Sequence, residues 1–162
     1  MSYFRIIDVS KNDPAWQFIR RHSPQTVGYS ENESDACYFF FAATDSSDEC
    51  LGLCVIEVGP MPFGPLAGEV TAWLEDILVL EAHRRRGIAT ALMHAALRRA
   101  WSHGARHMQW TVPYENLTAI AFYRKMGALF IPEEDPSSPN PERYYTAIMP
   151  NACMPPKPTA GK

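Results

Sequence analysis

The sequence is poor in cysteine, in long apolar runs and in basic charge, and each shortage excludes a class of protein. Its four cysteines, Cys37, Cys50, Cys54 and Cys153, contain one close pair, Cys50-x3-Cys54, and no second Cys or His pair follows at the spacing of zinc ligands. We therefore expect reduced, mostly buried thiols and no metal site.

Long apolar segments are also missing. The longest unbroken apolar stretches, residues 37–43 and 77–80, are far shorter than the roughly 20 residues that cross a bilayer. The first residues lack a basic segment followed by an apolar segment and a small-residue cleavage site, so they do not resemble an export signal. We expect a cytoplasmic protein that does not bind membranes.

Positive charge is too scarce for a protein that binds polyanions with its whole surface. The 15 Lys and Arg residues are outnumbered by 18 Asp and Glu residues, and the formal net charge is -3. We therefore expect no nucleic-acid partner. The motifs G-x-x-x-x-G-K-[ST] and G-x-G-x-x-G do not occur either, which disfavours nucleoside triphosphates and nicotinamide cofactors.

What is present indicates one globular domain. The chain has 162 residues, of which 46% are apolar and 20% charged, enough for one core and too few for two. The expected domain covers residues 1–150, and the Pro-rich residues 151–162 are expected to form a tail.

The apolar pattern predicts an α/β fold. Strands are expected at 3–9, 36–44, 51–58, 70–80, 107–113, 128–131 and 143–149, and helices at 15–21, 87–103 and 116–126. Residues 22–35 are expected to be irregular and residues 59–68 to form a loop. Because helices alternate with strands after residue 70, we expect a mixed sheet with helices as crossovers.

The strand at 70–80 is the most apolar, so both of its faces are expected to be covered. Strict alternation divides its apolar side chains into two sets, which are Trp73, Ile77 and Val79 on one face and Leu74, Leu78 and Leu80 on the other. Two adjacent acids, Glu75 and Asp76, interrupt the strand. They point to opposite faces unless a β-bulge redirects one of them.

A basic turn, residues 83–90, joins this strand to the following helix. A helix N-terminus presents unpaired main-chain N–H groups and the positive end of the macrodipole, so it accepts phosphate. Gly87 and Ala89 keep bulky side chains out of the way, and three arginines add attraction for an anion. A basic, solvated helix start is the structural alternative.

The helix at 116–126 carries two polar groups at helical spacing. Asn116 and Tyr123 share one face, where a phenol is able to donate a proton. The structural alternative is that Asn116 caps the helix and Tyr123 packs in the core.

Together, three segments resemble the GNAT superfamily of acetyl-CoA-dependent N-acetyltransferases, most closely its diamine and polyamine branch. They are Leu74-Glu75-Asp76-Ile77-Leu78-Val79, then Arg84-x-x-Gly87-x-Ala89, then Asn116 through Phe122-Tyr123 to Gly127-Ala128. The resemblance is strong over residues 70–128 and elsewhere extends only to the order of elements. It implies a GNAT-like mixed sheet flanked by helices on both faces, acetyl-CoA as cosubstrate, and a homodimer.

The resemblance also implies a set of carrier-binding residues. In the family, the strand bonds the acetyl carbonyl and pantetheine, the turn binds pyrophosphate through main-chain amides, and the later helix places an asparagine near the coenzyme and a tyrosine beside its sulfur. Transferred to this chain, the set is Ile77, Leu78, Val79, Arg84, Arg85, Arg86, Gly87, Ile88, Ala89, Thr90, Asn116 and Tyr123.

The implied reaction needs a base, because an alkylammonium with a pKa of about 10.4 is only roughly 0.1% neutral near pH 7.4. Glu75 is the first candidate and Asp76 the second. The structural alternative for both acids is that they are buried and form hydrogen bonds with the backbone of nearby loops. We expect the Leu78 main-chain N–H to stabilise charge on the acetyl oxygen and Tyr123 to protonate the leaving thiolate. No cysteine lies in a segment that pairs it with a His and an acid, which favours direct transfer.

The acceptor stays open at this point. The acids Glu133, Glu134 and Asp135 suit a cationic amine or form a solvated loop, and the Pro-rich connection at 132–141 departs from the polyamine branch. Small amines, amino acids, aminoglycosides and a protein N-terminus are all candidates. Two other classes are a coenzyme A-binding module without turnover and a nucleic-acid adaptor that uses residues 84–86.

Overall fold

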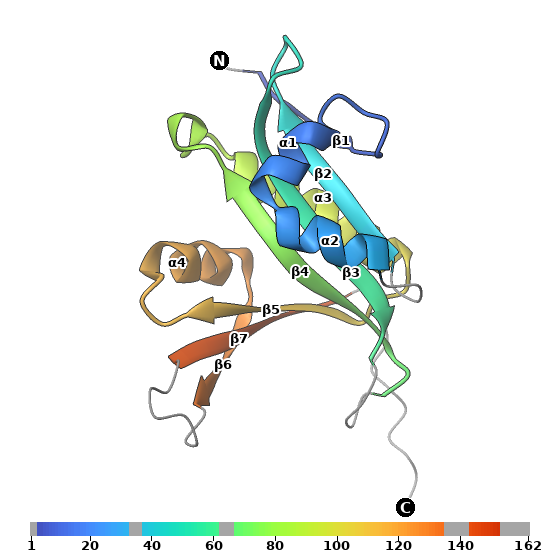
Figure 1. The fold of residues 1–162 in the computed structure, drawn as a ribbon. Helices are drawn as coiled ribbons and strands as arrows, with labels where there is room; N and C mark the ends of the chain where they lie inside the picture. Colours follow the sequence, from blue (N-terminus) through green and yellow to red (C-terminus); the bar gives the residue numbers. More distant parts are fainter. Residues whose placement is uncertain (1–2, 33–36, 62–66, 135–142, 153–162) are drawn as a thin grey trace, which may run out of the picture.

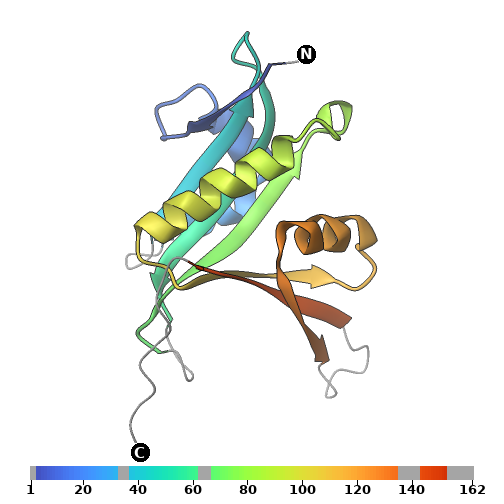
Figure 2. The ribbon, with the colours of Figure 1, turned by 180° about the vertical axis from the view of Figure 1, so that it is seen from behind.

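The computed structural model describes residues 3–32, 37–61, 67–134 and 143–152, which form a seven-stranded sheet with helices on both faces (Figures 1 and 2). The strand order is β1-β2-β3-β4-β5-β7-β6. The strands are β1 (Arg5–Asp8), β2 (Cys37–Thr44), β3 (Cys50–Pro60), β4 (Val70–Val79), β5 (His107–Pro113), β6 (Leu129–Glu134) and β7 (Arg143–Pro150). The helices are α1 (Trp16–His22), α2 (Pro24–Asn32), α3 (Ile88–Ser102) and α4 (Leu117–Met126), with a 3-10 turn, η1 (Glu81–His83).

Two apolar clusters hold the layers together. The larger one lies under α3 and α4 and includes Ile88, Leu92 and Ile120. The smaller one packs α1 and α2 on the opposite face, with Trp16 and Ile19 as buried members. The predicted fold class, a mixed sheet flanked by helices on both faces, is therefore confirmed.

One strand pair in the sheet is parallel and short. β4 pairs with β5 only through Ala72 with Met108 and Trp73 with Gln109, whereas the other neighbouring strands are antiparallel. Beyond Trp73 the two strands diverge toward their carboxyl ends, and α4 lies beside the opening (Figure 1). This divergence leaves one edge of β4 without a partner strand.

β4 carries the bulge that its two acids suggested. Val55 of β3 pairs with Asp76 and Ile56 pairs with Leu74, so Glu75 is the extra residue. As a result, Leu74 and Ile77 both contribute to the cluster under α3. The strict alternation that placed them on opposite faces was wrong, because the extra residue shifts the period of the strand.

Most of the remaining predicted elements are confirmed within one to three residues, but residues 24–32 form a helix where an irregular stretch was expected. This segment has five polar residues and Gly28, and Val27 is its buried aliphatic residue, so it lacks an apolar stripe. Pro24 at its first position was the available signal. The turn η1 was also not predicted.

Some predictions concern residues outside the described ranges. They include Cys153, the tail from residue 153 onward and Asp135. Among the described residues, no helix is long and apolar enough to cross a membrane.

Candidate active site

The turn that enters α3 has a backbone shaped for an anion. Arg85 and Gly87 both adopt positive φ, at 62° and 79°. Left-handed residues in a turn direct neighbouring main-chain N–H groups to one side and form an anion-binding concavity. Gly87 is the N-cap of α3 and supplies no side-chain cap, so the first N–H groups of the helix have no intrahelical acceptor.

Short contacts fasten this turn to the end of β4. The Arg84 Nε donates to the Val79 carbonyl at 3.1 Å, and the His83 main-chain N–H donates to the Leu80 carbonyl at 2.8 Å. Arg86 contacts the His83 ring nitrogen Nδ1 at 2.8 Å. Arg84 thus positions the turn, while Arg85 is exposed to solvent.

The open edge of β4 is defined by its register with β3. The Leu80 N–H donates to the opposite Leu51 carbonyl at 2.9 Å, which makes these residues a hydrogen-bonded pair. Hydrogen-bonded pairs alternate along an antiparallel ladder, so Leu78 also bonds to β3, while Ile77 and Val79 direct their main-chain groups to the open side. The oxyanion role expected for the Leu78 N–H is therefore wrong, because that N–H faces Leu53.

Tyr123 lies buried on α4, across the opening from β4. Its side chain is 7% exposed, and its ring centroid is 4.8 Å from that of Trp110 on β5. Burial, together with the neighbouring Cys54 and Asp76, raises the pKa of Tyr123 to about 12. The phenol therefore holds its proton throughout the neutral pH range.

The two acids of the bulge stand at the start of the open edge. Glu75 and Asp76 are both half-buried, and they separate Leu74 from Ile77 along β4. The Asp76 carboxylate lies near enough to Tyr123 and Cys54 to raise the pKa of both groups. Asp76 therefore belongs to the same region as the phenol, and Glu75 is its neighbour along β4.

A neighbouring row of side chains was missed from the sequence. Tyr38, Glu57 and Trp73 are successive partners across β2, β3 and β4, at the level where β4 and β5 still pair. Residues on either side of Glu57, Ile56 and Val58, belong to the cluster under α3, so the row lies on the opposite face. Only the strand register places this acid between two aromatic rings, and the sequence carries no local signal for it.

Asn116 is confirmed as the N-cap of α4, since its side chain accepts a hydrogen bond from the Ala119 N–H at 3.2 Å. A contact between Asn116 and the coenzyme stays a prediction. In the acidic segment, Glu133 is half-buried and accepts a bond from the Thr146 hydroxyl at 3.4 Å. That carboxylate is therefore partly engaged within the β6–β7 pair.

Two of the described thiols, Cys50 and Cys54, have an environment that suppresses reactivity, whereas Cys37 is exposed, so the expectation of mostly buried thiols was wrong for Cys37. Cys54 is fully buried, and burial strongly raises the pKa of its thiol, with the Asp76 charge acting in the same direction. Burial also raises the pKa of Cys50. In the described part of the chain, no group of three or more His, Cys, Asp or Glu side chains is arranged to hold a metal ion.

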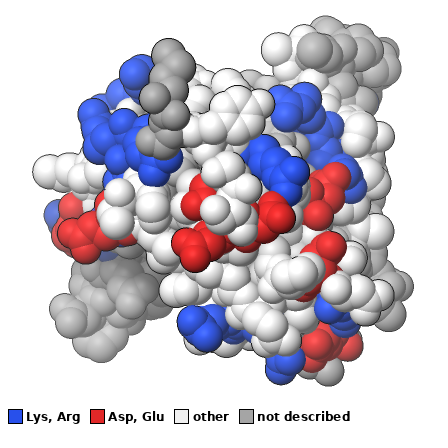
Figure 3. Space-filling view, turned by 90° about the horizontal axis from the view of Figure 1, so that it is seen from above, with Lys and Arg blue, Asp and Glu red and all other residues white. Residues whose placement is uncertain are grey.

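Charge on the face seen from above is mixed. Figure 3 views the molecule from above, where basic and acidic clusters alternate and neither sign covers the face. The basic turn is therefore a local feature, suited to a small anion better than to a long polyanion.

Comparison with known proteins identifies the family of this chain. A family model described as acetyltransferase (GNAT) matches residues 7–128. The L-ornithine N5-acetyltransferase NATA1 of Arabidopsis thaliana is 38% identical over 56 residues, which are 35% of this chain and 25% of that protein. The match thus spans about a quarter of the relative's length.

Solved structures share the fold at low sequence identity. Arabidopsis thaliana NAA60 in complex with acetyl-CoA has a TM-score of 0.72 at 16% identity and covers 92% of this chain and 100% of its own. A ribosomal-protein-S18-alanine N-acetyltransferase from Escherichia coli has a TM-score of 0.66 at 18% identity, covering 91% and 94%. The family model matches residues 7–128, and the basic turn and the open edge of β4 lie within that range. The chain therefore belongs to the acetyltransferase (GNAT) family.

Proposed function

We propose that the protein transfers the acetyl group of acetyl-CoA directly to a primary amine of a small molecule, such as a diamine, a polyamine or an amino acid. One observation carries the proposal. β4 leaves β5 after Trp73 and opens its Ile77 and Val79 main-chain groups between an anion-binding turn and a buried phenol.

The residues of this chain fit the carrier. The N–H groups of the turn and of the first turn of α3, from Arg85 to Thr90, are suited to a pyrophosphate, and residues 84–86 supply positive charge. On the open edge of β4, the main-chain groups of Ile77 and Val79 are suited to hydrogen bonds with the amide groups of an extended pantetheine arm. When bound, acetyl-CoA supplies an activated thioester.

The acceptor amine must lose a proton before it attacks, which costs about 4 kcal/mol for a free alkylammonium at neutral pH. Glu75 is the first candidate to accept this proton, directly or through a water molecule; its position as the bulge residue of β4, two residues beyond the last β4–β5 pair, supports this role. Asp76 is the second candidate.

The chain also provides for the charge that develops at the acetyl oxygen and at the sulfur. A main-chain N–H on the open side of β4, from Ile77 or Val79, replaces Leu78 as the expected donor to the acetyl oxygen. Tyr123 holds a proton at its Oη that is available to the leaving sulfur. The neutral, buried Cys54 does not compete as a nucleophile, which supports direct transfer.

The row of Tyr38, Glu57 and Trp73 supports a cationic acceptor. Aromatic residues next to a carboxylate suit an ammonium group, and Trp73 of this row precedes the candidate base Glu75 by two residues on β4. A protein N-terminus is the second candidate acceptor, because a structural neighbour is a ribosomal-protein alanine N-acetyltransferase.

An amine-panel assay of coenzyme A release tests the proposal. The panel contains diamines, polyamines, ornithine, an aminoglycoside, glucosamine and an alanine-terminated peptide, each with acetyl-CoA. We expect the highest kcat/KM with a small amine that carries a second positive charge. Turnover with the peptide alone would replace the small amine by a protein N-terminus, and tight coenzyme binding without any turnover would indicate a non-catalytic module.

A further inference from the structure

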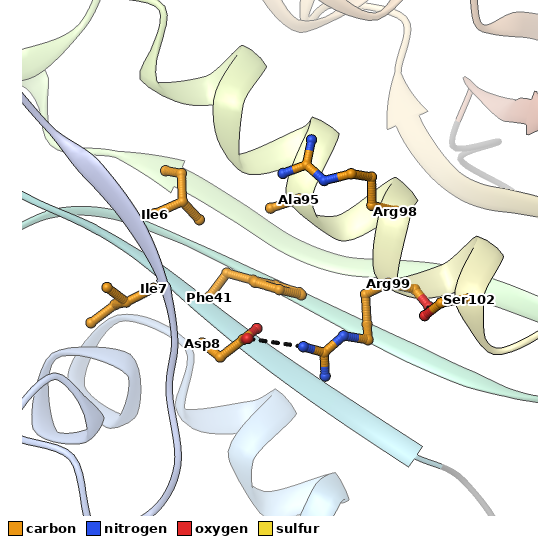
Figure 4. A pocket seen from close by; sticks show the side chains of 8 residues that line it. All are labelled: Ile6, Ile7, Asp8, Phe41, Ala95, Arg98, Arg99 and Ser102. Atoms are coloured by element: carbon orange, nitrogen blue, oxygen red, sulfur yellow. Dashed lines mark hydrogen bonds and ion pairs between the residues drawn. The ribbon is translucent and has the colours of Figure 1, made fainter.

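A groove lies between α3 and the edge strand β1, away from the turn and from the opening beside β5. Its volume is about 340 Å³. Figure 4 shows an apolar floor under a polar rim. The floor residues are Ile6, Phe41 and Ala95, and the rim residues are Asp8, Arg98 and Arg99.

Arg99 is held in place by several contacts. Its Nη2 donates to Oδ2 of Asp8 at 2.9 Å, and its guanidinium carbon lies 4.9 Å from the Phe39 ring centroid and 5.9 Å from that of Phe41. The charge of Arg99 is thus balanced by Asp8, and its plane is fixed over aromatic rings.

Arg98 differs from its neighbour because its side chain has no ion pair or hydrogen bond with any residue in the described ranges, whereas Arg99 is paired with Asp8. In Figure 4 the Arg98 side chain lies over α3 near Ala95, whereas Arg99 points toward Asp8, and both arginines line the groove. Two guanidinium groups and one carboxylate leave one uncompensated positive charge above an apolar floor.

We propose that this groove binds a small organic monocarboxylate with an apolar body. A carboxylate matches the planar donors of Arg98, and the net charge of the rim favours a single negative charge. The floor favours an aromatic or aliphatic body over an inorganic anion, and the volume is at the lower end for a small-molecule site.

The groove is separate from the proposed carrier site. Its first α3 residue, Ala95, follows Ile88 by seven positions, which corresponds to about 10 Å along the helix axis. The proposal does not depend on the acetyl transfer reaction and can fail or succeed independently of it.

Titration of the full chain with phenylacetate, followed by the methyl NMR signals of Ile6 and Ala95, tests the proposal. Phenylacetamide and phenethylamine serve as the neutral and cationic isosteres. We expect saturable shifts with phenylacetate that persist when acetyl-CoA is saturating, and an affinity for either isostere that is lower by about tenfold or more.

Arg98→Gln is the matched test variant, because the residue is exposed and glutamine is a good helix former. We expect it to weaken phenylacetate binding by about tenfold, while Arg20→Gln, at an exposed arginine of α1, leaves binding unchanged. Unaltered affinity in Arg98→Gln, equal binding of phenylacetamide, loss of the shifts with acetyl-CoA, or no saturation up to about 10 mM ligand would each overturn the proposal.

Discussion

Tyr123 shows how burial prepares a single side chain for a chemical role. The sequence placed its phenol on the same helix face as Asn116, but it did not reveal the Trp110 ring or the nearby Asp76 and Cys54. Trp110 belongs to the strand just before α4, but Cys54 and Asp76 belong to strands distant in the sequence, so the raised pKa of Tyr123 is a property of the assembled sheet. A phenol that keeps its proton suits a general acid.

Replacing Tyr123 by phenylalanine removes this proton and keeps the ring packing. We expect kcat to fall about 10- to 100-fold while the Kd for acetyl-CoA changes little. Steady-state kinetics and a calorimetric titration measure the two quantities. An unchanged kcat would remove Tyr123 from the proposed mechanism.

Substituting each acid of the bulge in turn distinguishes the role of Glu75 from that of Asp76. We expect Glu75→Gln to lower kcat by about 100-fold at neutral pH. The reduction in kcat should be smaller at higher pH, where more of the amine is already neutral. Asp76→Asn serves as the matched control. If Asp76→Asn shows the larger loss and the stronger pH dependence, the roles of the two acids are exchanged.

At the scale of elements, the period of apolar residues was sufficient to predict α3, α4 and β5, because each has a continuous pattern that ends at Gly or Pro. The period of apolar residues did not predict α2, because this helix has little apolar surface. The bulge was suggested by adjacent acids, but which main-chain groups face the opening depends on the pairing of Leu80 with Leu51. Pairing between strands is not encoded in a local pattern.

The turn between η1 and α3 has its own test. A Cβ at Gly87 meets no atom within 4 Å, so Gly87→Ala strains the backbone through its φ of 79° without a clash. We expect about 1 kcal/mol lower stability and a Kd for acetyl-CoA raised by about tenfold. Gly104→Ala, at φ 82° beyond the other end of α3, is the matched control. A similar rise in Kd in both variants would argue against the turn as the anion site.

At the scale of the whole molecule, the sheet opens where β4 and β5 diverge, and this opening brings residues 75–79, 84–90 and 123 into one region. The fold class was predictable from the order of elements. The row of Tyr38, Glu57 and Trp73 was not, because it arises from the register of three strands.

Alkaline unfolding tests the buried phenol in the context of the whole fold. The pKa of Tyr123 is about 12 in the folded protein and about 10 in an unfolded chain, so the unfolded state ionises first as pH rises. We expect stability to be fully present below pH 10 and to fall by on the order of 2 kcal/mol between pH 10 and 12. Urea unfolding at each pH measures this fall. The same decrease in Tyr123→Phe would show that other groups cause it.

We propose that the carrier binds along the open edge of β4 and at the turn before α3. Amide hydrogen exchange with and without acetyl-CoA tests this most directly. We expect the carrier to slow exchange at Ile77, Val79 and residues 85–90, whereas the Leu78 amide already exchanges slowly because it bonds to β3. Binding that protects none of these amides, or that protects Leu78 alone, would contradict it.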